Sequence, residues 1–481
     1  MLRQEMEPWL RTIRASALAA ALGVAPICLP AQQPLPQAPA MNLIAAAGRQ
    51  PMAAGAQTGM GNAPTSSQPP AGVNGPRLTI EEAEQLALRN NPNISVARLL
   101  ALAQGQVTRE ARAPELPQAE ANFNAVGSHD NSRITGAGTL NSPRILNKAA
   151  AGLTISQLIT DFGRTHNLVK SAQSSARAQL EDEKATELDI KLAVDQAFYQ
   201  ALTSQALLEV AQQTVAQRQA IGDQVAALTK SKVKSELDLS FANVGIAQAK
   251  LLLLDAENSE ASAMAALNAV LGSEQDQQYA LVDETHGNPP PAPSDPEALV
   301  QQAFQQRPDL ASLNDRYLAA KQYATAERDL WFPTISAMTA GGSTPVRDDL
   351  IQSSWYFGAG ANVNVPVFNG FLYSAEGKEA KYRAGAAQEQ VRNLRDMVAR
   401  DVRTAVLNAQ TAFQRIGVTE GELDQANLAL DLAQARYKIG LSSIVELTQA
   451  QLAQTQAEID NTNAMYSYQT SLAEVRYEVG Q

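Results

Sequence analysis

The stretch from Trp355 to Gly370, WYFGAGANVNVPVFNG, decides the architecture of this chain. From Trp355 to Asn364, apolar residues alternate with tyrosine, glycine and asparagine. This period of two predicts a β-strand with one apolar face and one small, polar face. No proline follows Pro366 up to Gln481. Because a proline inside a helix costs about 3 kcal/mol, its absence predicts long helices after the strand.

Three earlier segments show the same alternation, so we expect four strands at 118–128, 149–159, 333–343 and 355–367. Strands of about ten residues with one apolar and one polar face are typical of transmembrane β-barrels. An ordinary half-buried antiparallel sheet shows the same alternation. The polar faces favour the barrel, because they carry mostly asparagine, glycine and serine rather than lysine or glutamate. The candidate residues facing a barrel lumen are Asn122, Asn124, Asn362 and Asn364.

Four strands are too few to close a barrel within one chain. Open sheet edges cannot face lipid, and the smallest membrane barrels have eight strands. Identical copies must therefore share the barrel wall. The composition leaves two, three or four copies open.

Long helices are predicted in both halves of the chain. Proline is absent from residues 144–288 and again from 367–481. From Val391 to Tyr437, apolar residues recur with a period near 3.5, which indicates a coiled coil with left-handed supercoiling. Each half offers a span of about 67 residues, or about 100 Å of helix, followed by a break and a shorter helix. We therefore expect two antiparallel helical hairpins, at 162–271 and 369–479.

The two halves, residues 77–288 and 289–481, share their order of landmarks, which indicates an internal duplication. The alternative is chance similarity among helices rich in alanine and glutamine, and the preserved order argues against it. The matched landmarks are Asn91-Pro92 with Arg307-Pro308, Leu158–Gly163 with Val365–Gly370, and Ser235–Leu239 with Ser443–Leu447.

The N-terminal segment is typical of an exported protein. Arg11 and Arg14 precede a short apolar run, and Ala31 ends a possible cleavage site, so residues 1–31 are predicted to be a signal peptide. Cys28 is a candidate lipidation site, although the large Ile27 before it fits poorly, and the alternative is a cysteine discarded with the leader. Residues 32–76 are rich in proline, alanine and glutamine and are predicted to be a disordered linker.

Composition argues against several classes of function. The formal net charge of -11 argues against nucleic-acid binding, which needs basic patches. One cysteine and three scattered histidines, His129, His166 and His286, give no metal-site spacing. No uninterrupted apolar run of 18 residues follows the first thirty, which argues against helical membrane spans. We predict no enzyme, no metal and no cofactor.

The chain resembles the TolC-type outer membrane efflux protein family (outer membrane factors) over roughly residues 78–481. The resemblance rests on LTIEEAEQLALRNNP at residues 78–92, on the strand-to-helix junctions Phe162-Gly163 and Phe368-Asn369-Gly370, and on Arg436–Leu447, RYKIGLSSIVEL. It implies an α+β membrane protein that assembles as a homotrimer. Three protomers with four strands each would form a twelve-stranded outer membrane barrel, continued by a long α-helical coiled-coil barrel in the periplasm.

The family also implies a role and partners. Its members are exit ducts of tripartite efflux pumps or type I secretion systems, gated at the periplasmic helical end. A periplasmic adaptor (membrane fusion) protein docks at the helix tips, and an inner membrane transporter supplies energy. The resemblance does not indicate whether drugs, metals or proteins are transported.

The resemblance assigns roles to particular residues. Tyr437 matches a tyrosine that helps to close the periplasmic end, and Gly440-Leu441 match the dipeptide read by the adaptor. Glu446 matches an acidic residue at the pore constriction, with Asp238 as its equivalent in the first half. Gln449 and Ser442 stand where the family has a second acidic residue and a basic gate residue. These two departures leave a double acidic ring and a basic gating link as open questions.

The alternative function is a periplasmic coiled-coil scaffold or adaptor without a pore. Such a protein would not need four lipid-compatible strands. A solvated helix position is the ordinary interpretation of Glu446, and a coiled-coil seam position is that of Tyr437.

Overall fold

The computed structural model describes residues 76–126, 148–273, 275, 277–283, 289–346 and 353–481. The predicted signal peptide at 1–31, Cys28 and all but the last residue of the predicted linker lie outside the described residues. So do residues 127 and 128, the end of the first predicted strand.

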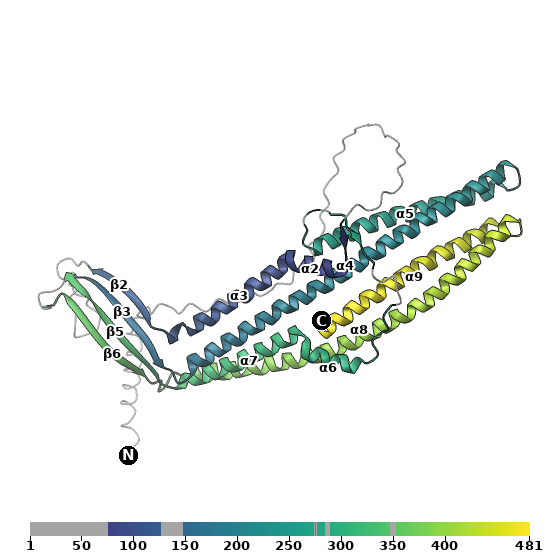
Figure 1. The fold of residues 1–481 in the computed structure, drawn as a ribbon. Coiled ribbons are helices and arrows are strands. Elements are labelled where there is room, and N and C mark those ends of the chain that lie inside the picture. Colours follow the sequence, from purple (N-terminus) through teal and green to yellow (C-terminus); the bar gives the residue numbers. More distant parts are fainter. Residues whose placement is uncertain (1–75, 127–147, 274, 276, 284–288, 347–352) are drawn as a thin grey trace, which may run out of the picture. The chain divides into compact units, whose positions relative to one another are not determined.

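The described chain runs through the same series of elements twice (Figure 1). The first series is α2 (Ile80–Asn90), α3 (Pro92–Arg112), η1 (Ala113–Glu115), β2 (Gln118–Val126), β3 (Lys148–Thr160), α4 (Arg164–Lys230) and α5 (Glu236–Val270). The second series is α6 (Pro296–Gln306), α7 (Pro308–Arg328), η2 (Asp329–Trp331), β5 (Thr334–Val346), β6 (Trp355–Asn364), α8 (Leu372–Lys438) and α9 (Ile444–Val479). Two short strands, β1 (Arg77–Leu78) and β4 (Ala280–Leu281), pair in parallel beside the first series.

Corresponding helices have nearly the same length. α2 and α6 have 11 residues, α3 and α7 have 21, α4 and α8 have 67, and α5 and α9 have 35 and 36. The breaks between helices follow from local chemistry. Thr79 forms a capping box with Glu82 at the start of α2, and Pro92 and Pro308 occupy the first turns of α3 and α7, where a missing amide hydrogen does no harm.

Four strands form one antiparallel sheet in the order β2-β3-β5-β6. Residues paired across neighbouring strands share a face of a sheet. The pairing Asn122–Gly152–Gly342–Tyr356 runs across all four strands, and Asn362 pairs with Ser336. The other face carries the row Phe123–Ala151–Ser343–Trp355, together with Phe357 and Val363. The sheet therefore has one face of small and polar residues and one apolar face.

Two strand ends differ from the sequence prediction by three residues each. The fourth strand ends at Asn364 rather than at residue 367, because Pro366 has no amide hydrogen for the ladder. The third runs to Val346, beyond the predicted residue 343, because Ser343 still pairs with Trp355 and Val346 with Ala149.

The two strand-to-helix junctions each place two consecutive residues in the left-handed region. These are Phe162 and Gly163 (φ 55° and 109°) before α4, and Gly370 and Phe371 (φ 66° and 67°) before α8. Counting back from the helix starts, Phe162 corresponds to Gly370 and Gly163 to Phe371. The sequence match of Gly163 with Gly370 was therefore wrong by one residue, because it aligned the glycines rather than the backbone conformation.

The helices bury mainly small residues. α4 packs on α3, α5, α7 and α9, and α8 packs on α7 and α9. On α8, Val402, Ala405, Ala409 and Thr419 are buried, so Thr419 occupies the gap in the apolar repeat between Ile416 and Leu423. Small side chains let the helix axes approach closely.

α5 is long and apolar enough, by length and composition alone, to cross a membrane, and it is the single such helix found within the described residues. Only 17% of its apolar window is buried. A lone helix of this kind is weak evidence for a membrane span.

A buried carboxylate lies where α2, α4 and α9 meet. Asp195 of α4 is 6% exposed, and its Oδ2 is 3.8 Å from a guanidinium nitrogen of Arg476 in α9. Burial, and next the nearby Glu84 carboxylate, raise the pKa of Asp195 to about 7, while Arg476 opposes the rise. The folded protein therefore holds a proton at a pH where the unfolded chain has lost it.

This proton makes stability depend on pH. Between the ordinary pKa of 3.8 and about 7, the folded state binds more protons than the unfolded state. The free energy of unfolding should then fall as pH rises through this window, by up to about 1.4 kcal/mol per pH unit. Asp195→Asn should remove this slope in denaturant unfolding of the detergent-purified protein from pH 4.5 to 8, whereas Asp424→Asn at an exposed position of α8 should keep it. A slope that survives in Asp195→Asn would show that another group binds the proton.

Candidate functional site

The two helical hairpins end in the same turn. Gly440 has φ +80°, and the Leu441 amide donates to the Arg436 carbonyl at 2.8 Å. In the first half, Lys232 has φ +58°, and the Val233 amide donates to the Leu228 carbonyl at 2.9 Å. The first half thus forms the same turn with Lys232 where the second half has Gly440. Lys232 bears the backbone strain that a residue with a side chain meets in the left-handed region.

The tip residues predicted to meet an adaptor are exposed. Leu441 is 68% exposed, and Ile439 and Val233 are exposed to a similar degree. The residues after each turn, Ser443 and Ser235, cap α9 and α5 with identical backbone angles. The tip of each hairpin thus exposes apolar side chains on a turn with the same backbone conformation.

Tyr437, the candidate gating residue, joins the two hairpins. It is 3% exposed, and the ammonium of Lys234 in the first hairpin lies 4.1 Å from its ring centroid. Burial raises the pKa of Tyr437, and Asp238 adds to the rise. The Tyr437 hydroxyl has no hydrogen-bond partner among the described residues. The ring, rather than the hydroxyl, makes the contact between the hairpins.

The two candidate acidic residues differ in their contacts. The Asp238 carboxylate accepts a hydrogen bond from the Ser235 amide at 3.2 Å and so belongs to the cap of α5. The Glu446 carboxylate instead lies 3.6 Å from Arg436, and its side chain is 44% exposed. Asp238 and Glu446 thus stand at equivalent positions, but the Asp238 carboxylate is held in a helix cap whereas the Glu446 carboxylate is accessible.

A second link between the hairpins was missed by sequence reasoning. The Arg218 guanidinium of α4 donates to the Gln451 side-chain oxygen of α9, and both residues are buried. Gly245 of α5 lies beside Arg218, and a Cβ there would be in ordinary van der Waals contact, 3.7 Å from a guanidinium nitrogen. Burial lowers the pKa of Arg218. No motif marks either residue in the sequence.

The polar face of the sheet carries the four asparagines predicted to line a lumen. The strand pairing places Asn122, Asn124, Asn362 and Asn364 on this one face. Tyr356 shares this face, and its ring lies over Gly152 and Gly342. A Cβ on either glycine would clash with the phenol group of Tyr356. Larger residues at these glycines would displace the ring.

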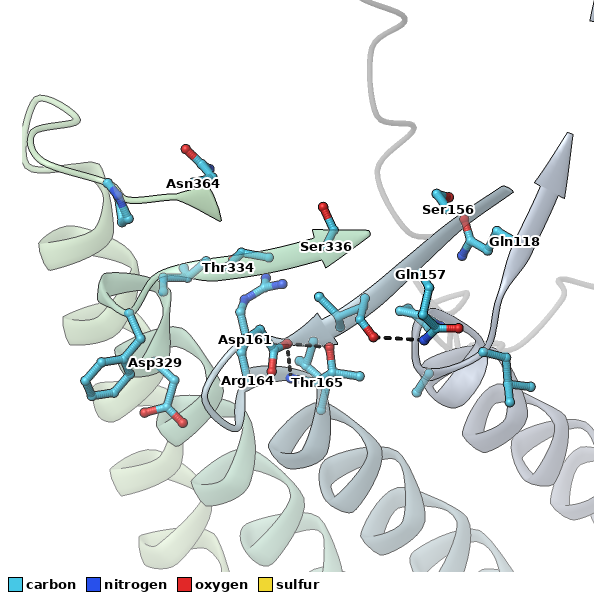
Figure 2. A pocket seen from close by; sticks show the side chains of 18 of the residues that line it. Gln118, Ser156, Gln157, Asp161, Arg164, Thr165, Asp329, Thr334, Ser336 and Asn364 are labelled. Atoms are coloured by element: carbon cyan, nitrogen blue, oxygen red, sulfur yellow. Dashed lines mark hydrogen bonds between the residues drawn. The ribbon is translucent and has the colours of Figure 1, made fainter. Parts of the chain in front are cut away.

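A cavity of about 460 Å³ lies on the polar face where the sheet meets α4 (Figure 2). Asp161 accepts hydrogen bonds from the amides of Gly163 and Thr165, which fixes the start of α4. Arg164, Thr334 and Ser336 line the cavity. Within the part of the chain that the structure describes, no group of histidine, cysteine, aspartate and glutamate has the arrangement of a metal site.

Comparison with known proteins gives consistent results. A family profile described as "Outer membrane efflux protein" matches residues 84–273 and 299–481. The outer membrane protein TolC of Vibrio cholerae is 25% identical over 350 residues, which cover 70% of this chain and 78% of that protein. The probable efflux pump outer membrane protein TtgC of Pseudomonas putida is 24% identical over 379 residues, covering 77% and 76%.

Solved structures share the fold. CusC, described as forming a transmembrane channel, superposes with a TM-score of 0.73 at 20% identity, covering 83% of this chain and 92% of that one. The architecture of β2 to α9 is therefore TolC-like. Since the family profile covers most of both halves, the chain belongs to the outer membrane efflux protein family.

Proposed function

We propose that three copies of this chain form the exit duct of a tripartite efflux pump or a type I secretion system, a passive conduit in the outer membrane. The observation that carries this proposal is the four-stranded sheet, which has one apolar face and one asparagine-rich face. Copies that join β6 of one protomer to β2 of the next would remove every open edge from the lipid. Twelve strands would enclose a polar lumen lined by the four asparagines.

The number of copies comes from the family resemblance, since the sheet itself requires only closure. The family match favours a channel over a periplasmic scaffold or adaptor. It also gives no support for an enzyme, because the family is one of transport proteins.

The helical end carries the proposed gate and docking site. Tyr437 and the Arg218–Gln451 bond both hold the second hairpin against the first. Opening would separate these contacts as one hairpin moves past the other, a shift between two packings. An adaptor that binds the exposed Gly440-Leu441 tip could favour the open packing, while an inner membrane transporter drives the substrate.

Neighbouring residues at the middle of β6 test the assignment of the two faces. Ala361 lies on the apolar face and Asn362 on the polar face. Arginine on the lipid face near the bilayer midplane costs about 2–4 kcal/mol per copy. Ala361→Arg should therefore reduce the amount recovered in the outer membrane and the heat-sensitive oligomer seen in unheated gel electrophoresis, whereas Asn362→Arg should leave both near wild type.

Equal tolerance of the two arginines would contradict the barrel. A wild-type protein that fractionates as a soluble monomer would favour the scaffold instead.

Selectivity tests the acidic residue of the pore. Three copies of an accessible carboxylate at a narrow end attract cations. Glu446→Gln should lower the cation-to-anion permeability ratio severalfold in planar bilayers. Asp238→Asn should change it less, because its carboxylate is held in a helix cap. The matched control is Glu257→Gln on α5, and an unchanged ratio in Glu446→Gln would remove Glu446 from the constriction.

The buried hydrogen bond between the hairpins tests the gate. Gln451→Leu leaves the Arg218 guanidinium buried without its acceptor, at a cost of about 1–3 kcal/mol to the closed packing. Single-channel recordings should show a larger open fraction. Tyr437→Phe should change it little, since the hydroxyl has no partner among the described residues. The double variant Arg218→Leu with Gln451→Leu should return towards wild type, and failure to do so would argue against a specific link.

A further inference from the structure

A basic groove runs between the membrane-proximal ends of α7 and α8. It encloses about 400 Å³. Its cationic lining comes from both helices, as Lys321 and Arg328 of α7 and Lys378 and Lys381 of α8. The lining includes no carboxylate. The three lysines make no ion pair within the described residues, whereas Arg328 pairs with Asp329 at 3.0 Å.

The groove lies on the face of α7 away from Tyr323. Arg164 lines the cavity on the polar face, and its charge also interacts electrostatically with Tyr323 of α7. Burial and then Glu327 raise the pKa of Tyr323, while Arg164 lowers it. Residues on a helix turn by about 100° each, so Lys321, two positions before Tyr323, lies nearly opposite to it. Tyr323, which interacts with Arg164, and the basic groove thus lie on opposite faces of α7.

Aromatic residues separate the groove from the strands. Trp331 and Tyr373 line its sheet end, with their rings edge to face at 5.8 Å. Trp331 is the last residue of η2, shortly before β5 begins at Thr334. Tryptophan and tyrosine prefer the level of the lipid headgroups at a membrane surface. The cations therefore lie where headgroup phosphates would be, beside strands that meet lipid.

The basic character recurs in the first half. The positions corresponding to Thr325, Arg328 and Lys378 carry Arg109, Arg112 and Lys170, all exposed. Glu115 replaces Trp331 there and pairs with Arg112 at 3.9 Å. The aromatic boundary and the unpaired cations occur together only in the second half, among the described residues.

We propose that the groove between α7 and α8 binds the phosphate group of an acidic phospholipid from the periplasmic leaflet of the outer membrane. Three lysines without counter-charges match an anion, and Trp331 matches the boundary between acyl chains and headgroups. The proposal rests on the proposed function in one respect, namely that the apolar face of the sheet meets lipid. It adds a lipid preference that the closed barrel does not require.

The test measures lipid binding to the full chain purified in detergent. Short-chain phosphatidylglycerol and phosphatidylcholine with the same acyl chains are titrated, and bound lipid is counted by native mass spectrometry. Wild type should bind phosphatidylglycerol about tenfold more tightly, and increasing the ionic strength to about 0.5 M should reduce the difference. The triple variant Lys321→Gln, Lys378→Gln, Lys381→Gln should lose the preference.

Matched controls separate the groove from general charge. Lys184→Gln, Lys250→Gln, Arg392→Gln removes three exposed cations elsewhere and should keep the preference. If the triple variant fails to fold, the single variant Lys378→Gln, at an exposed position, replaces it. This variant should show a preference for phosphatidylglycerol between that of wild type and none. Inorganic phosphate at equal concentration should leave lipid binding unchanged, and displacement by phosphate would overturn the assignment to a lipid.

Conductance distinguishes failure of this site from failure of the duct. The triple variant should conduct like wild type in phosphatidylcholine bilayers. A wild type that conducts but binds both lipids equally would overturn the lipid site alone. A wild type without conductance would contradict the duct.

Discussion

The outer edges of β2 and β6 carry backbone amides and carbonyls that no strand of the described sheet pairs with. In water such edges cost little, but in hydrocarbon each unpaired group costs several kcal/mol. The apolar face of the same sheet, with Trp355, Phe357 and Val363 exposed, has no partner among the described elements either. Closure by further copies satisfies both needs at once. The proposed assembly, its lumen and its pore all depend on this constraint.

The repeated series of elements extends the same logic to the helices. Each half contributes two neighbouring strands and one hairpin, and α4 of the first half packs on α7 and α9 of the second. The contact between the hairpins uses a buried ring at Tyr437 and a buried guanidinium at Arg218. Breaking either contact costs free energy, and so does leaving the buried group without a partner. Such contacts favour two discrete packings of the hairpins over a continuous range of positions.

Much of this architecture could be predicted from the sequence. The absence of proline gave helices of about the observed length, and the alternation around Trp355 gave the strand faces, because both signals reflect local backbone chemistry. Other features depend on tertiary context. These are the strand ends, the register of the junction at Gly370 and the left-handed conformation of Lys232, with φ +58°. The capping of Asp238 and the bond from Arg218 to Gln451 depend on side chains brought together from distant segments, which one sequence does not reveal.

The equal lengths of α4 and α8 restrict how such a chain can change. Both helices have 67 residues, so each turn lies the same number of residues from the start of its long helix. Inserting one heptad into α4 alone would move its tip by about 10 Å past that of α8, although the seam would stay in phase. Insertions and deletions in the two long helices must therefore come in matched pairs, so the reach of the hairpins towards another membrane can vary only when both repeats change together.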